Sequence, residues 1–79
     1  MRYKVQISVN GEIVEKQIIN SDSPAMAVTT VANYLLRSNT IDMFEAKIIN
    51  EQGVGWYMVV QILHDSKEFK IVTRKKING

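Results

Sequence analysis

The chain of 79 residues contains no cysteine, one proline and one histidine, and it has no long apolar run. Without cysteine, the fold cannot depend on disulfides or on a zinc site built from thiolates. Residues 1–4 lack the apolar segment of a signal peptide, and no run approaches the roughly eighteen residues that indicate a membrane span. We therefore expect a cytoplasmic protein that makes no contact with membranes.

Catalytic and cofactor signatures are missing as well. His64 has Asp65 beside it to orient a general base, but no serine or cysteine nucleophile and no second histidine accompanies the pair. The eight acidic residues are dispersed singly, without the close spacing of a metal loop. A structural or merely exposed histidine is the more common case. The sequence predicts a protein that is not an enzyme, with no catalytic residue, metal, cofactor or small-molecule substrate.

Composition and charge indicate one globular unit with an uneven charge distribution. Hydrophobic residues make up 46% of the chain and charged residues 23%, which argues against disorder. Residues 1–79 are close to the minimum size at which one core outweighs the conformational entropy of folding, so we expect a single domain. The net charge is +2, yet half of the ten cations lie within residues 67–76. The abundance of Ile, Asn and Lys suggests a phage or mobile-element source.

One segment has the pattern of a helix. Asp22 or Ser23 can cap its start, and Pro24 suits the first helical position, where its missing N–H costs nothing. Apolar residues then recur at i, i+3, i+4 and i+7, namely Val28, Val31, Ala32 and Leu35, with Ala27 and Leu36 beside them. Residues 38–39, Ser-Asn, form a plausible stop. The two threonines on its polar side make this a mediocre helix alone, so it must pack against a sheet.

The first two strands form a hairpin. Residues 2–9 alternate between apolar and polar side chains, and Asn10-Gly11 is the strongest short signal for a type I′ turn. A second strand over residues 12–20 then runs antiparallel to the first. A regular two-residue loop pairs Val9 with Glu12, Ile7 with Val14, Val5 with Lys16 and Tyr3 with Ile18. This register places Ile13 and Ile19 on the face away from the helix, and a bulge would change it.

The remaining chain reads as a meander of three strands. The expected strands cover residues 40–50, 56–63 and 68–73, joined by turns at 51–55 and 64–66, with residues 74–79 as a frayed polar tail. A bulged hairpin explains the glycines of the first turn better than a phosphate cradle, which needs a following helix. The order is ββαβββ, and the predicted fold class is α+β with two layers, a mainly antiparallel sheet and one helix across one face.

The face of the sheet opposite the helix has apolar positions that no other element can cover. The expected protein interface consists of Ile49, Tyr57, Val59 and Leu63, with Ile19 and Val72 near it. A contiguous apolar patch on neighbouring strands is typical of an interface. The leading hypothesis is a small accessory or regulatory protein that acts through protein–protein contacts, with a homodimer formed through this sheet face.

The alternative function is a nucleic-acid-binding module that uses the basic C-terminal strand. The expected nucleic-acid contacts are Arg2, Lys4, Lys67, Lys70, Arg74, Lys75 and Lys76. An ordinary solvated edge strand explains the same lysines, because lysines on edges prevent pairing between sheets. Recognition on a sheet usually adds exposed aromatic rings for stacking, and Tyr57 is the only candidate there.

Overall fold

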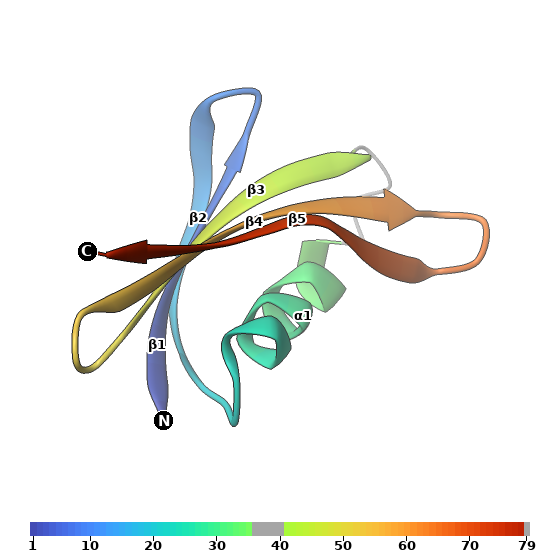
Figure 1. The fold of residues 1–79 in the computed structure, drawn as a ribbon. Coiled ribbons are helices and arrows are strands. Elements are labelled where there is room, and N and C mark those ends of the chain that lie inside the picture. Colours follow the sequence, from blue (N-terminus) through green and yellow to red (C-terminus); the bar gives the residue numbers. More distant parts are fainter. Residues whose placement is uncertain (36–40, 79) are drawn as a thin grey trace.

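The computed structural model describes residues 1–35 and 41–78, which form five strands and one helix (Figure 1). The elements in chain order are β1 (Arg2–Val9), β2 (Glu12–Asn20), α1 (Pro24–Leu35), β3 (Met43–Asn50), β4 (Val54–Leu63) and β5 (Glu68–Asn78). Every pair of neighbouring strands is antiparallel, and the strand order is β2-β1-β3-β4-β5. The predicted α+β class and the ββαβββ order are confirmed.

Helix α1 begins where the sequence indicates. The backbone N–H of Met26 donates to the Ser23 hydroxyl at 3.2 Å, so Ser23 is the N-cap and Pro24 occupies the first helical position. The buried side of the helix consists of Ala27, Val28, Val31 and Ala32, as predicted. The expectations for the side chains of Leu35 and Leu36 and for a stop at residues 38–39 lie outside the described part of the structure.

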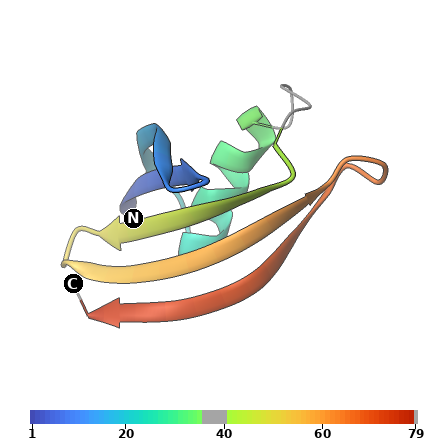
Figure 2. The same ribbon diagram turned by 90° about the horizontal axis from the view of Figure 1, so that it is seen from above.

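The core fills the space between the helix and one face of the sheet. Helix α1 packs mainly on β1, β2 and β3, and the β4–β5 hairpin extends past it (Figure 2). The buried hydrophobic side chains of the sheet come from alternate positions of the three strands β1, β3 and β4: Tyr3, Val5, Ile7, Phe44, Ala46, Ile48, Met58, Val60 and Ile62. The hairpin β1–β2 runs steeply across the direction of the other strands (Figure 1). This twist is the usual right-handed twist of a sheet, accumulated over five strands.

The first hairpin has the predicted turn but not the predicted register. Asn10 and Gly11 have positive φ values of 52° and 82°, as a type I′ turn requires, and Val9 pairs with Glu12. Ser8 still pairs with Ile13, and between Ser8 and Ile7 the register shifts by one residue. The regular pairing expected from a two-residue loop is therefore wrong from Ile7 to the start of β1.

The cause of the shift is a β-bulge in β2. Ile7 pairs with Glu15, so Val14 is the extra residue and its side chain is 46% exposed. The bulge reverses the two isoleucines that follow: Ile19 lies opposite Tyr3 and packs against the core, whereas Ile18 faces away from the helix and is 62% exposed. The expectation that Ile19 lies on the uncovered face is thereby corrected.

Strand β5 is longer than the sequence indicates. Residues 74–78, expected to be part of a frayed tail, pair with β4: Lys76 lies opposite Trp56 and Ile77 opposite Gly55. A second bulge places Val72 outside the regular pairing, with 52% of its side chain exposed. Polar residues can form this strand because backbone hydrogen bonds to β4, rather than burial, hold it in place. Each of the two edge strands, β2 and β5, thus contains one bulge.

Candidate functional site

The face of the sheet away from α1, called the outer face here, carries a row of polar side chains across all five strands. The pairing register places Lys16, Gln6, Lys47, Tyr57 and Lys75 side by side on β2, β1, β3, β4 and β5. Neighbouring strands lie about 4.8 Å apart, so this central row spans about 19 Å. Three of its five members are lysines, and the fourth strand contributes the aromatic ring.

Apolar side chains flank the central row on both sides. Towards the β3–β4 turn, the next row contains Ile18, Lys4, Ile49, Gly55 and Ile77. On the other side, the row contains Ile13, Ser8, Glu45, Val59 and Thr73, on β2, β1, β3, β4 and β5 in that order. Aliphatic side chains on the outer face are therefore interspersed with charged and polar ones, and they do not form one continuous apolar patch.

The charge of the outer face is strongly positive. By the register, its cations are Arg2, Lys4, Lys16, Lys47, Lys70 and Lys75, and its carboxylates are Glu45 and Glu68. Glu51, in the turn after β3, adds a third carboxylate at the edge of this face, where it accepts a hydrogen bond from the backbone N–H of Arg2. Six cations against three carboxylates compare with a net charge of +2 for the whole chain. The positive charge is therefore concentrated on the side of the sheet that the helix leaves uncovered.

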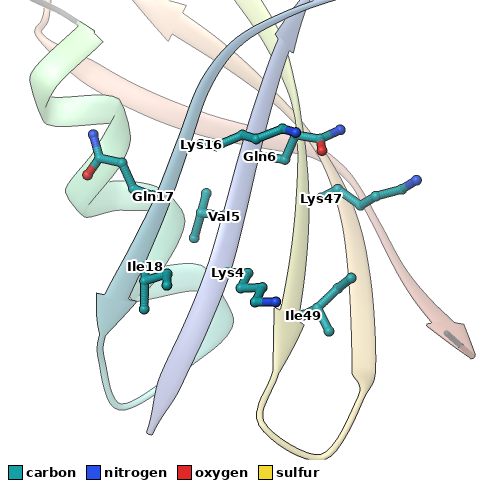
Figure 3. Close-up of a pocket in the computed structure, with 8 residues that line it drawn as sticks. All are labelled: Lys4, Val5, Gln6, Lys16, Gln17, Ile18, Lys47 and Ile49. Carbon is teal, nitrogen blue, oxygen red and sulfur yellow. The ribbon is translucent and has the colours of Figure 1, made fainter.

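The outer face is hollowed over β2, β1 and β3. This lysine hollow has a volume of about 460 Å³, and it is lined by Lys4, Val5, Gln6, Lys16, Gln17, Ile18, Lys47 and Ile49. Figure 3 shows Lys16 extending beside Gln6 towards β3, where Lys47 lies, while Gln17 points towards the helix. The lining includes three ammonium groups and no carboxylate. Anions would meet attraction there without a competing negative charge.

A second, smaller hollow adjoins the first. This tyrosine hollow has a volume of about 180 Å³, and it is lined by Gln6, Ser8, Glu45, Ala46, Lys47 and Tyr57. It shares Gln6 and Lys47 with the lysine hollow. The phenol of Tyr57 donates a hydrogen bond to Oε2 of Glu45 at 2.9 Å. This hydrogen bond, together with desolvation and the negative charge of Glu45, raises the pKa of Tyr57 above its ordinary value.

The residues expected at a protein interface all lie on the outer face. Ile49 is 37% exposed, and Tyr57, Val59 and Leu63 are half-buried. Lys47 and Tyr57 occupy the central row between Ile49 and Val59, so charged side chains lie next to the four residues. Val72, expected near them, is the bulged residue of β5 and lies outside the regular rows.

The residues expected to contact nucleic acid are divided between surfaces. Arg2, Lys4, Lys70 and Lys75 lie on the outer face. Arg74 and Lys76 pair with Met58 and Trp56, which places them on the helix side of the sheet, and Lys67 lies in the turn before β5 with a φ of 56°. The structure therefore brings part of this set together and separates the basic C-terminal segment.

Sequence reasoning missed Lys16 and Lys47, two members of the central row. Along β3, Phe44, Ala46 and Ile48 are buried, and alternation places Lys47 on the other face of the strand. The sequence could therefore have predicted which face Lys47 occupies. The pairing of β1 with β3 brings Lys47 beside Gln6 and near Lys4, and it depends on strand order, which has no local signal. Lys16 is placed beside Gln6 by the register of the β1–β2 hairpin.

His64 has a structural position at the end of β4. Its Nε2 lies 2.8 Å from the carbonyl oxygen of Ile41 and 3.3 Å from Oδ1 of Asp42, so the ring joins the segment before β3 to the β4–β5 turn. Among residues 1–35 and 41–78, no three His, Asp or Glu side chains gather closely enough to hold a metal ion. Helix α1, with 12 residues, is too short to cross a membrane, and it is the only helix in these ranges.

Comparisons with protein-family models, with curated proteins and with solved structures find no match for this chain. Similar small α+β folds serve unrelated functions, so the outline of the fold does not indicate one. A function has to be inferred from the chemistry of the outer face.

Proposed function

We propose that the protein is a small, non-enzymatic accessory or regulatory protein of the cytoplasm that binds the phosphate backbone of nucleic acid on its outer face. The observation that carries the proposal is the central row, in which Lys47 and Lys75 flank the ring of Tyr57 and Lys16 lies two strands beyond Lys47. Lysines neutralise phosphates and release the counterions that surround a nucleic acid, which supplies most of the affinity of such complexes. This proposal moves the contact surface from the basic C-terminal strand to the face of the sheet.

The charge pattern favours an anionic partner over a second copy of the chain. A twofold contact through the outer face would bring the lysine rows of both copies together. Like charges at close range cost energy, and removing ammonium groups from water adds to that cost. Self-association through Ile49, Tyr57, Val59 and Leu63 stays a prediction. It requires that the second copy neutralise the lysines of the central row.

The mixture of side chains favours nucleic acid over an acidic protein. Single strands bind on surfaces that combine cations along the backbone with aromatic rings on which bases stack. Tyr57 lies between Lys47 and Lys75 in the central row, and aliphatic side chains flank both sides of the row. A basic groove for acidic peptides would need the cations but would gain nothing specific from a ring between them.

The test is the salt dependence of binding to a labelled oligo(dT) strand of about twenty nucleotides. With four contacts from Lys4 and the central row, the plot of log K against log salt concentration should have a slope of about −3. The triple variant Lys16→Gln, Lys47→Gln, Lys75→Gln should reduce the slope to about −1. These lysines are exposed or at the rim of the hollow, so we expect both the fold and its circular dichroism to be retained.

The matched control removes the same charge from the other surfaces. The triple variant Lys67→Gln, Arg74→Gln, Lys76→Gln should leave the slope nearly unchanged, because these cations lie on the helix side or in the turn. Equal flattening in both variants would mean that only the net charge matters. Flattening in the control alone would return the contacts to the C-terminal strand. No binding by micromolar protein at about 50 mM salt would refute the proposal.

A further inference from the structure

The tyrosine hollow combines hydrogen-bonding groups of a kind that phosphate binding does not need. Its rim carries the Gln6 amide, the Ser8 hydroxyl, the Glu45 carboxylate and the Tyr57 phenol, and Lys47 separates it from the lysine hollow. A carboxylate in the middle of a basic face weakens attraction for phosphates. Glu45 is the carboxylate that the register places directly beside the central row, next to Lys47 and opposite Val59.

We propose that the tyrosine hollow reads one base of a bound single strand and prefers a base with an exocyclic amino group, such as cytosine, over thymine or uracil. This inference rests on the proposed function, because phosphates on Lys47 and the lysine hollow bring the base to the tyrosine hollow. The reading group is the Glu45 carboxylate, which accepts a hydrogen bond from the amino group. Tyr57 supplies the ring against which the base lies.

The hydrogen-bonding capacity of Glu45 fits this role. An ionised carboxylate accepts about four hydrogen bonds, and the phenol of Tyr57 occupies one position on Oε2. The N4 amino group of cytosine is a donor, and Glu or Asp is its usual partner. Thymine presents the acceptor O4 at the same place, so its oxygen would face the carboxylate without a proton between them. The same hollow therefore attracts one pyrimidine and repels the other.

The shape of the outer face restricts the ligand to a single strand. The major groove of a duplex is about 12 Å wide and admits a helix or a two-stranded ribbon. The central row spans five strands, about 19 Å, which is wider than this groove. Bases can reach the tyrosine hollow only when they are unpaired and turned towards the protein.

The experiment compares oligo(dC) with oligo(dT) of equal length at neutral pH and one salt concentration. We expect the native protein to bind oligo(dC) about tenfold more tightly, the effect of one hydrogen bond to a charged group. Glu45→Gln should tighten binding of oligo(dT), because a negative charge is lost, and should reduce the ratio between the two strands to near one. Glutamine offers both a donor and an acceptor and so no longer separates the pyrimidines.

The matched control is Glu68→Gln, which removes a different carboxylate of the outer face. Glu68 pairs with Leu63 at the far end of β4, and it does not line the tyrosine hollow. Its loss should tighten binding of both strands and keep the tenfold ratio. Tyr57→Phe should also keep the ratio, because the ring remains and the carboxylate is released from its hydrogen bond. A ratio that disappears in Tyr57→Phe and persists in Glu45→Gln would assign the reading to the phenol and overturn the inference.

The outcomes separate this inference from the proposed function. Equal binding of oligo(dC) and oligo(dT), with the steep salt dependence described above, would refute base reading and leave phosphate binding in place. Absence of binding to either strand would refute both. Equally tight binding of poly-glutamate in competition with oligo(dC) would identify an acidic protein as the ligand and would also refute base reading.

Discussion

The bulge in β2 makes a sharp prediction for the neighbouring residues Ile18 and Ile19. Ile18 is 62% exposed, so little more than a third of its surface is buried. Full burial of isoleucine stabilises by about 1.5–3 kcal/mol, and Ile18→Lys should therefore cost at most about 1 kcal/mol. The lysine stem can cover part of the same surface, which lowers the expected cost to about 0.5 kcal/mol.

Ile19→Lys should be far more damaging. Ile19 packs against the core opposite Tyr3, on the side of the sheet that faces the helix. Ile19 is partly buried, so a lysine there loses part of the value of full burial and must turn its ammonium group towards water, and we expect a loss of about 1–2 kcal/mol. A domain of this size has a total stability of only about 4–12 kcal/mol. Urea denaturation should show a midpoint lower by about 1–2 M.

The pair of variants also separates stability from binding. Ile18 lines the lysine hollow, so Ile18→Lys adds a cation there and should tighten binding to oligo(dT), whereas folded Ile19→Lys should not. A regular hairpin without the bulge makes the opposite prediction, with Ile18 in the core and Ile19 in water. An unfolded Ile18→Lys variant beside an undisturbed Ile19→Lys variant would show that the register described here is wrong.

Three further predictions concern β4 and its surroundings. Val59→Lys should tighten oligonucleotide binding and sediment like the native protein, whereas a native dimer that this variant loses would instead support self-association. The raised pKa of Tyr57 means that its hydrogen bond to Glu45 stabilises the fold below about pH 10 and that this stabilisation is lost as the pH rises through the folded pKa. The difference in unfolding free energy between native protein and Tyr57→Phe should therefore shrink above about pH 10, and a constant difference would contradict this origin. His64→Ala removes the hydrogen bond to the carbonyl of Ile41 and should cost about 0.5–1.5 kcal/mol in thermal melts, with an unchanged melting temperature speaking against a structural role.

Local signals predicted the elements of this fold but not their exact pairing. The N-cap at Ser23 and the turn at Asn10-Gly11 each rest on chemistry within a few residues, so the sequence contains them in full. The choice between Ile18 and Ile19 for the core does not rest on such local chemistry. Two adjacent isoleucines fit either face, and packing against the helix and Tyr3 decides between them, with the bulge as the consequence.

The candidate site shows the same limit. Alternation along β3 identifies Lys47 as a residue of the uncovered face, but only the pairing of β1 with β3 places it near Lys4 and Lys16. A local sequence pattern does not indicate which strands become neighbours when a helix lies between the two strands in the chain. The basic C-terminal segment is divided between two faces for a local reason, since Lys75 and Lys76 are adjacent in sequence and therefore point to opposite faces of the sheet.

The position of the two bulges has a consequence for how copies of the protein behave when they crowd together. Val14 and Val72 interrupt the two strands whose outer edges have no neighbour, and each bulge twists its edge away from a flat ladder. A nucleic-acid strand that binds several copies would hold these edges close to one another for long periods. Regular edges would then zip into a continuous sheet and the array would become permanent. With a kink built into each edge, neighbouring copies can be packed densely and still separate when the strand is released.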